Sequence, residues 1–161
     1  MTDFEIRRAR ESDQGEILTL IMNYQKWDVK FAKRYYDSFF KKAKVTKYDD
    51  VYVALLDSQI AGVIGYCFDY FSTDHVLWLG WFVVDEEYRG NRIGSNLLRK
   101  VEESLIKKGR KGLKLFVSTE SENYRALKFY QKNGFRLEGC LKDYYGENED
   151  QLILAKILIL K

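Results

Sequence analysis

Hydrophobic side chains recur along this chain with two spacings, which separate expected strands from expected helices. Alternating apolar and polar residues, as in Leu113–Ser118, are typical of a strand that buries one face. Val76–Val84 is nearly all apolar, as expected of a central strand covered on both faces. Apolar residues three and four positions apart, as in Ile93–Lys108, are typical of an amphipathic helix. The pattern predicts, in chain order, a strand at 4–7, helices at 12–22 (capped by Ser12) and 29–44, strands at 51–56, 60–71 and 76–84, a helix at 93–108, a strand at 113–118, a helix at 123–133, and strands at 135–141 and 152–160.

The predicted order of elements is therefore β-α-α-β-β-β-α-β-α-β-β. The strand, helix, strand unit in the centre requires a parallel pair, because a crossover joins its strands, whereas directly connected strands form antiparallel meanders. The fold class expected is α/β with a mixed central sheet. Since the 161 residues contain no proline and no low-complexity linker, residues 1–161 are expected to form a single domain.

Composition and charge exclude several classes of protein. A net charge of +3 suits a small polyanionic ligand, but it is not the clustered basic stripe of a nucleic-acid-binding protein. Cys67 and Cys140 belong to no C-x-x-C pair, so we expect two small buried thiols in a reducing compartment and no metal site. The charged N-terminus resembles no signal peptide, and the longest apolar run is too short to cross a bilayer. The sequence therefore predicts a cytoplasmic protein without a membrane partner.

The segment Val83–Leu98 (VVDEEYRGNRIGSNLL) runs from the expected central strand through a turn into a helix. A helix N-terminus presents backbone N–H groups without carbonyl partners, and its dipole favours an anion. Gly90 and Gly94 allow an anion to approach the backbone, and Arg89 and Arg92 add positive charge. The pattern predicts a phosphate or pyrophosphate cradle. The alternative is an ordinary strand-to-helix turn that needs small residues.

The segment Ser118–Phe135 (STESENYRALKFYQKNGF) places Asn123 just after a strand, at the start of a helix. Tyr130 follows seven residues later, two turns along the same face. Its phenol would then lie near whatever the strand ends point at. The alternative is that Asn123 only caps the helix and that Tyr130 only packs in the core.

Together the two segments resemble the cofactor motifs of the GNAT superfamily of acetyl-CoA-dependent N-acetyltransferases. The first family motif reads Gln/Arg-x-x-Gly-x-Gly/Ala, and RGNRIG at 89–94 matches its first and last positions. The second reads Asn-x-x-Ala-x-x-x-Tyr-x-x-x-Gly-Phe and is matched by Asn123, Ala126, Tyr130, Gly134 and Phe135. Arg92 departs from the family, which usually has a glycine there. Its side chain would either crowd the turn or, as we favour, reach a phosphate.

The resemblance implies acetyl-CoA as the cosubstrate and direct attack of a primary amine on the acetyl group. Tyr130 would be the catalytic residue, a general acid that protonates the departing thiolate. Backbone groups at the end of the central strand would hold the pantetheine arm and polarise the thioester carbonyl. The implied cofactor-binding residues are Phe82, Val83, Val84, Arg89, Gly90, Asn91, Arg92, Ile93, Gly94, Ser95, Asn123 and Tyr130.

The acceptor amine is not identified by the sequence. Tyr144 and Tyr145 lie between the last two predicted strands and resemble tyrosines that hold the acceptor peptide in protein N-terminal acetyltransferases. With the aromatic helix around 27–40 they would line the acceptor pocket; the alternative is a turn that packs on the core. Three functions stay open: acetylation of a small amine, acetylation of a protein N-terminus, and non-catalytic sensing of acyl-CoA. The oligomeric state, monomer or homodimer, is also open.

No general base is evident from the sequence. Ribosomal-protein alanine acetyltransferases carry a glutamate on the strand before the motif asparagine, and Ser118 stands at that position here. The candidates elsewhere are Asp69, Asp74, His75 and Glu138. A chain of water molecules leading to bulk solvent is the alternative.

Overall fold

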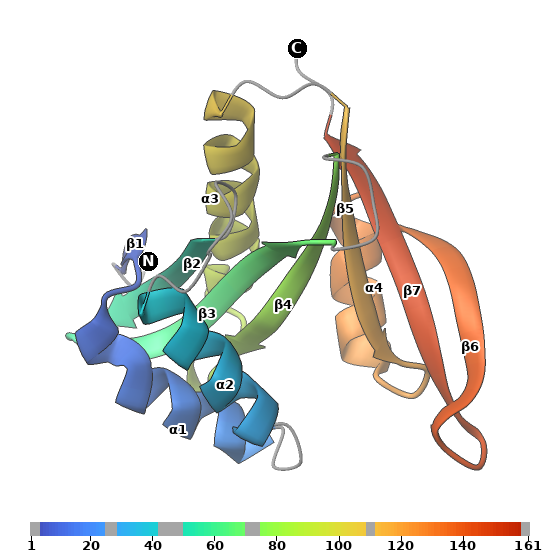
Figure 1. Ribbon diagram of the computed structural model, residues 1–161, viewed down its shortest axis with the longest axis horizontal. Helices are drawn as coiled ribbons and strands as arrows, with labels where there is room; N and C mark the ends of the chain where they lie inside the picture. Colours follow the sequence, from blue (N-terminus) through green and yellow to red (C-terminus); the bar gives the residue numbers. More distant parts are fainter. Residues whose placement is uncertain (1–3, 25–28, 42–49, 70–74, 109–111, 159–161) are drawn as a thin grey trace. The chain divides into compact units, whose positions relative to one another are not determined.

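The computed structural model describes residues 4–24, 29–41, 50–69, 75–108 and 112–158 (Figure 1). Its elements are β1 (Glu5–Arg8), the 3-10 turn η1 (Glu11–Asp13), α1 (Gln14–Tyr24), α2 (Val29–Phe40), β2 (Asp50–Leu56), β3 (Gln59–Phe68), β4 (Val76–Val84), the 3-10 turn η3 (Glu86–Tyr88), α3 (Ile93–Lys107), β5 (Leu113–Glu120), α4 (Tyr124–Lys132), β6 (Arg136–Gly146) and β7 (Glu149–Leu158). In the described residues seven strands follow the order β1-β2-β3-β4-β5-β7-β6. Strands β4 and β5 are parallel, while the β1–β2, β2–β3, β5–β7 and β6–β7 pairs are antiparallel. The α/β class, the mixed sheet and the order of elements are confirmed.

The chain groups into two compact units. Residues 1–68 and 79–108 form the first unit, and residues 69–78 and 109–161 form the second. Strand β4 belongs to both, because the boundary falls after Trp78. The single domain expected from the sequence stays a prediction. No helix of the described residues is long and apolar enough to cross a membrane.

In the first unit, helices α2 and α3 cover opposite faces of β3 (Figure 1). A Cβ atom on Gly62 would lie 3.1 Å from Leu97 Cδ1 on α3, whereas one on Gly65 would lie 3.4 Å from the Tyr35 hydroxyl on α2. Residues three apart in a strand point to opposite faces, so the two helices lie on opposite sides of the strand. The same Gly62 Cβ would lie 3.2 Å from the carbonyl oxygen of Val83. Glycine at this position therefore lets the end of β4 and the start of α3 pack closely on β3.

The start of α1 differs from the prediction. Ser12 does not cap the helix but lies within η1. Asp13, only 8% exposed, accepts hydrogen bonds from the backbone N–H of Arg10 (2.7 Å) and from both terminal guanidinium nitrogens of Arg7 (2.7 and 2.9 Å). The hydrogen bonds from Arg7 lower the pKa of the Asp13 carboxyl, against the opposing effect of burial. Asp13 is the third residue of η1, the position from which an acidic side chain bonds back to the backbone N–H of the N-cap residue.

In the second unit, β6 is longer than predicted. Tyr144 and Tyr145 lie on β6, not in a loop between strands, because the hairpin closes at Glu147–Asn148 and Gly146 pairs with Glu149. The register shifts between Leu141 and Gly146, and Asp143 within that stretch has a φ of +51°. This irregularity removes the regular alternation of apolar and polar residues by which a strand is predicted.

The expectation of two buried thiols is also corrected. Cys67 on β3 is partly buried, but Cys140 on β6 is exposed. Strand β6 is at the end of the strand order, with β7 as its neighbour, and most of the β6 side chains are exposed.

The helix predicted at 29–44 begins at Val29 as expected and ends at Phe40; residues 42–44 lie outside the described part of the chain.

Candidate functional site

The end of β4 carries an unusual backbone conformation. Trp81 has a φ of +52°, although it is not a glycine and lies inside a strand. The left-handed conformation costs an L-residue roughly 1–2 kcal/mol, and such residues cluster at functional sites. The parallel pairing of β4 with β5 covers Val76, Leu77 and Trp78, three residues before this point. Trp81 packs against Tyr35 of α2, with 6.4 Å between ring centroids.

The last residues of β4 are held by hydrogen bonding to β3. The backbone N–H of Asp85 donates to the carbonyl oxygen of Ala61 at 2.9 Å. Val83 is buried, while Phe82 and Val84 are partly exposed. The sequence placed Phe82, Val83 and Val84 at the end of a central strand, and the structure places them there, directly after the left-handed Trp81.

Tyr24, the last residue of α1, organises the turn after β4. Its hydroxyl accepts a hydrogen bond from the backbone N–H of Glu86 at 2.6 Å and lies 3.4 Å from Oδ1 of Asp85, to which it donates. The same Asp85 oxygen accepts from the backbone N–H of Glu87 at 3.0 Å and so caps η3. Sequence reasoning missed Tyr24, because nothing local in the sequence links it to a turn more than sixty residues away.

The guanidinium group of Arg89 is engaged within this turn. Its Nε donates to the carbonyl oxygen of Val84 at 3.1 Å, and Nη1 contacts Oε1 of Glu86 at 3.3 Å. Its Cζ lies 4.8 Å from the centre of the Tyr24 ring, a cation–π distance. Arg89 thus fastens the turn to the end of β4 while its side chain keeps 29% of its surface exposed.

The turn leads into α3, and the first backbone N–H groups of α3 point away from the helix along its axis. The first intrahelical bond runs from the Asn96 N–H to the carbonyl oxygen of Arg92 (3.0 Å), so the preceding amides of Ile93, Gly94 and Ser95 have no carbonyl of the helix to bind. Gly90 (φ +86°) and Arg92 (φ +62°) are both left-handed. The Arg92 conformation is one that glycine adopts at least cost, which explains why the first motif usually has a glycine there. The start of a helix with this geometry has backbone N–H groups that could donate to an anion.

Asn91, the remaining turn residue predicted to bind the cofactor, is exposed and donates its side-chain amide to the carbonyl oxygen of Tyr88 at 3.2 Å. It therefore closes the turn locally.

Among the described residues, no three His, Cys, Asp or Glu side chains come close enough together to hold a metal ion.

The second motif forms α4 in the second unit. Asn123 is the N-cap: its amide oxygen accepts from the backbone N–H of Ala126 at 3.1 Å. Tyr130 is 7% exposed and packs edge-on against Phe129 and Phe135, with 5.4 and 5.5 Å between ring centroids. Burial raises the pKa of the Tyr130 phenol well above its usual value, because the charged form loses its hydration. The phenol therefore stays protonated over the physiological pH range.

The residues considered as general bases lie in different surroundings. The Asp69 carboxylate accepts from the indole Nε1 of Trp78 at 2.9 Å. Glu138 pairs with the Lys114 amine at 3.0 Å, and His75 is exposed in the turn before β4. Asp74 lies outside the described residues, and Ser118 is partly buried on β5 opposite Ile153.

Tyr144 and Tyr145 pack edge-on, with 5.0 Å between ring centroids. Tyr144 is 58% exposed, whereas the Tyr145 hydroxyl accepts a hydrogen bond from the side-chain amide of Gln151 at 2.9 Å. One of the two rings is therefore available for contact from solvent, and the other is positioned by β7.

Comparisons with known proteins identify the family and the fold. The family model of the GNAT acetyltransferases matches residues 16–135. An N-alpha-acetyltransferase of Saccharolobus solfataricus is 29% identical over 97% of this chain and 94% of its own length. An uncharacterised N-acetyltransferase of Archaeoglobus fulgidus is 30% identical over 82% of this chain and 92% of its own length. The crystal structure of a putative GNAT acetyltransferase from Desulfovibrio desulfuricans shares the fold, with a TM-score of 0.83 and 20% identity over 97% of this chain and 99% of that one.

This chain belongs to the GNAT acetyltransferase family. It is an acyltransferase, and its acyl donor is acetyl-CoA, the cosubstrate of that family. The family predicted from the two motifs is confirmed.

Proposed function

We propose that this protein transfers the acetyl group of acetyl-CoA to the N-terminal amine of a polypeptide, by direct attack of the amine on the thioester. The main observation in support of acetyl transfer is the start of α3. There, three successive backbone N–H groups lack hydrogen-bond partners within the helix and lie next to two left-handed residues. Such amides suit the pyrophosphate of acetyl-CoA. The full-length similarity to an N-alpha-acetyltransferase supports a polypeptide as the acceptor.

The residues of the turn would divide the binding of acetyl-CoA among them. The backbone N–H groups of Ile93, Gly94 and Ser95 donate to the pyrophosphate, with Gly90 and Asn91 shaping the turn. Because the Arg89 guanidinium already binds Val84 and Glu86, it supports the cradle, and Arg92 is the side chain free to reach a phosphate. In the second unit Asn123 uses its amide oxygen as a cap, which leaves its amide nitrogen to donate to the pantetheine arm.

Acetyl-CoA supplies the acetyl group as a thioester, and the protein would activate it through the backbone of Phe82–Val84. Amide N–H groups aimed at the carbonyl oxygen stabilise the negative charge that develops there. The resemblance to the family implies this role, and the left-handed Trp81, which turns the backbone just before these residues, supports it. The new N–C bond forms as the C–S bond breaks, and the bonding electron pair leaves with sulfur.

Tyr130 would supply the proton that the sulfur needs. Its raised pKa keeps the phenol protonated, so it can donate to the departing thiolate and regain a proton from solvent. The amine loses its own proton to solvent water, since the described acid candidates are engaged by Trp78 and Lys114 or, as with His75, stand exposed in a turn. We propose no side chain as the base.

A thiol-release assay with acetyl-CoA tests this function. The acceptors are peptides with free N-termini, the same peptides with blocked N-termini, free amino acids, and small primary amines. Free N-terminal peptides should release coenzyme A, and blocked ones should not. Activity with small amines alone would contradict the polypeptide acceptor. Binding of acetyl-CoA without turnover of any acceptor would favour an acyl-CoA sensor instead.

A further inference from the structure

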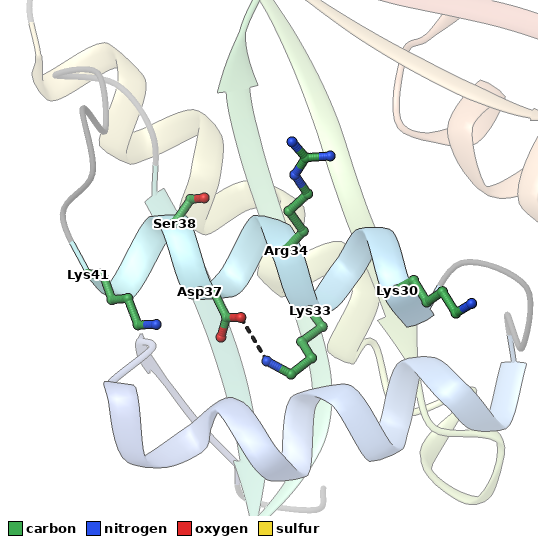
Figure 2. Close-up of a pocket in the computed structure, with 6 residues that line it drawn as sticks. All are labelled: Lys30, Lys33, Arg34, Asp37, Ser38 and Lys41. Carbon is green, nitrogen blue, oxygen red and sulfur yellow. Dashed lines mark hydrogen bonds and ion pairs between the residues drawn. The ribbon is translucent and has the colours of Figure 1, made fainter.

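Helix α2 has two chemically distinct faces. Ala32, Tyr36 and Phe39 are buried against the rest of the first unit. On the solvent side a hollow of about 380 Å³ is lined by Lys30, Lys33, Arg34, Asp37, Ser38 and Lys41 (Figure 2). These six residues are spaced three or four apart, so they form one continuous face of the helix.

The positive charge of this face is mostly uncompensated. Asp37 is its single acid, and its carboxylate is occupied by the Lys33 amine and by the Gln14 side-chain amide, both at 2.7 Å. The Lys33 hydrogen bond lowers the pKa of Asp37, which keeps the pair ionised. Among the residues that the structure describes, no carboxylate forms an ion pair with Lys30, Arg34 or Lys41.

The sequence concentrates basic residues in and just after this helix. Residues 29–47 contain seven lysines or arginines and one acid, Asp37. The 27 basic and 24 acidic residues of the whole chain therefore leave 20 basic and 23 acidic residues elsewhere. In the described part of this segment, four basic residues stand against one acid, and a local field of this sign attracts anions and repels polycationic amines.

The dimensions of the basic face suit an extended chain. Lys30 and Lys41 are eleven residues apart, which corresponds to about 16 Å along a helix axis. Lys30, Arg34 and Lys41 lie within about 40° of one another around that axis, given 3.6 residues per turn. An extended peptide covers the same length in about five residues. Phe31, 64% exposed, borders the row and offers an apolar contact beside the cations.

We propose that this basic face of α2 binds an acidic segment of the acceptor polypeptide, downstream of the N-terminus that is acetylated. The inference rests on the proposed function, because it assumes a polypeptide acceptor. A row of three unpaired cations beside an exposed aromatic ring matches alternating carboxylates and an apolar side chain. The face would select acceptors by charge, while the acetyl transfer itself takes place elsewhere on the protein.

The test compares two acceptor peptides with the same free N-terminal residue. One carries Glu and Asp at positions three to eight, and the other carries Gln and Asn at the same positions. We expect KM to be about tenfold lower for the acidic peptide at low salt, because each of three exposed ion pairs would add a small favourable free energy of binding. The preference should shrink as the salt concentration rises. Equal KM values for two peptides that are both acetylated would overturn the inference and leave the proposed function standing.

The decisive variant is Lys30→Gln/Arg34→Gln/Lys41→Gln, which removes the three unpaired cations. A matched control, Arg99→Gln/Lys107→Gln/Arg136→Gln, removes the same charge from exposed positions on α3 and β6. The α2 variant should lose the preference for the acidic peptide, and the control should keep it. Since all six replaced side chains are exposed, both triple variants should unfold near the wild-type temperature. If the α2 triple variant does not fold, the single variant Arg34→Gln replaces it in the experiment. Retention of the preference in a folded α2 variant would overturn the inference.

A binding measurement separates this inference from catalysis. The acidic peptide with an acetylated N-terminus and a fluorescent label should bind wild-type protein and the control, and bind the α2 variant at least fivefold more weakly. This result is expected even if no acceptor is turned over. Equal binding by all three proteins would overturn the proposal. A single-stranded oligonucleotide that binds the same face more tightly than the peptide would overturn it in favour of a nucleic-acid partner.

Discussion

The hydroxyl oxygen of Tyr24 lies 2.6 Å from the backbone nitrogen of Glu86, which joins the end of α1 to the turn that leads into α3. The same ring lies under the guanidinium group of Arg89. Helix α1 therefore helps to fix a turn that is also bonded to β4 through Arg89 and to β3 through the backbone of Asp85. The turn that we propose binds the pyrophosphate is thus positioned in part by a residue outside both motifs.

Replacing Tyr24 by phenylalanine removes the hydroxyl but keeps the ring. The backbone N–H of Glu86 loses its acceptor and Asp85 loses a donor, so the free energy of unfolding should fall by about 1 kcal/mol. The KM for acetyl-CoA should rise several-fold because the turn is less ordered. Thermal unfolding and steady-state kinetics measure the two effects. Tyr124→Phe, at a 68% exposed tyrosine, is the control and should change neither; an unchanged KM in Tyr24→Phe would show that the turn holds its shape unaided.

Gly94 and Gly15 are the second residues of two helices, which makes them a matched pair. Gly94→Val places a branched side chain beside the amides proposed to bind the pyrophosphate. Acetyl-CoA should then no longer raise the unfolding temperature, whereas it should raise that of wild type by mass action. Gly15→Val adds the same side chain where a Cβ meets nothing within 4 Å, and should leave the ligand shift intact. A normal shift in Gly94→Val would remove this turn from the binding site.

Arg92 combines a strained backbone with a proposed contact to phosphate. Arg92→Gly relieves the left-handed conformation, so the protein should become more stable by up to about 1 kcal/mol. The same change removes a guanidinium group, so acetyl-CoA should bind several-fold more weakly. Calorimetry measures affinity, and chemical denaturation measures stability. Tighter binding by the glycine variant would mean that the arginine side chain crowds the turn instead.

The parts of this protein that the sequence predicted are those set by local patterns. Helix α3 has an apolar face, including Leu97 and Leu98, that repeats every three to four residues, and it was predicted within one residue at its end. The turn before this helix was predicted for the same reason, since glycine, arginine and a helix start lie within six residues; that the turn binds an anion stays a prediction.

The parts that the sequence did not predict depend on distant segments or on backbone shape. Trp81 has a left-handed φ that cannot be predicted from its residue type, and its ring packs against α2. Ser12 falls within η1, where Asp13 accepts hydrogen bonds from the Arg10 backbone and from Arg7 of β1, a contact that no local pattern indicates. Tyr144 and Tyr145 fall on β6 because the register shifts near Asp143, whose conformation interrupts the alternation. The basic face of α2 was not predicted, because the contacts of Asp37 with Lys33 and Gln14 are seen only in the structure.

Asp13 makes stability depend on acid pH. Its hydrogen bonds with Arg7 lower its pKa below the unfolded value of about 3.9, so the stabilisation is complete above that value and is lost as pH falls through the lower folded pKa. Asp13→Asn should reduce the free energy of unfolding at pH 7 by about 1–3 kcal/mol, because charged hydrogen bonds to a buried group are removed. Urea denaturation at pH 7 and below pH 4 should show the difference between the two proteins shrinking toward acid. A constant difference would show that the carboxylate charge is not what stabilises this turn.

The proton of the acceptor amine gives the last prediction. An alkyl ammonium group cannot attack until it loses a proton, and two of the acids considered as its base are bound by other groups: Asp69 by Trp78 and Glu138 by Lys114. The rate at subsaturating acceptor should therefore rise with pH along the ionisation of the amine itself. Asp69→Asn, His75→Ala and Glu138→Gln should each lower kcat/KM by less than about tenfold, short of a general-base contribution.

Tyr130→Phe is the contrasting variant in the same experiment. It removes the proton donor but keeps the ring that packs on Phe129 and Phe135, so kcat should fall by roughly 10²–10⁴ while acetyl-CoA binding changes little. Because burial raises the pKa of Tyr130, its phenol stays protonated below that raised value, and wild type should show no falling limb in kcat between pH 6 and 9. If instead one acid or histidine variant abolished an inflection near neutral pH, that residue would be the base and the amine would not depend on solvent for its deprotonation.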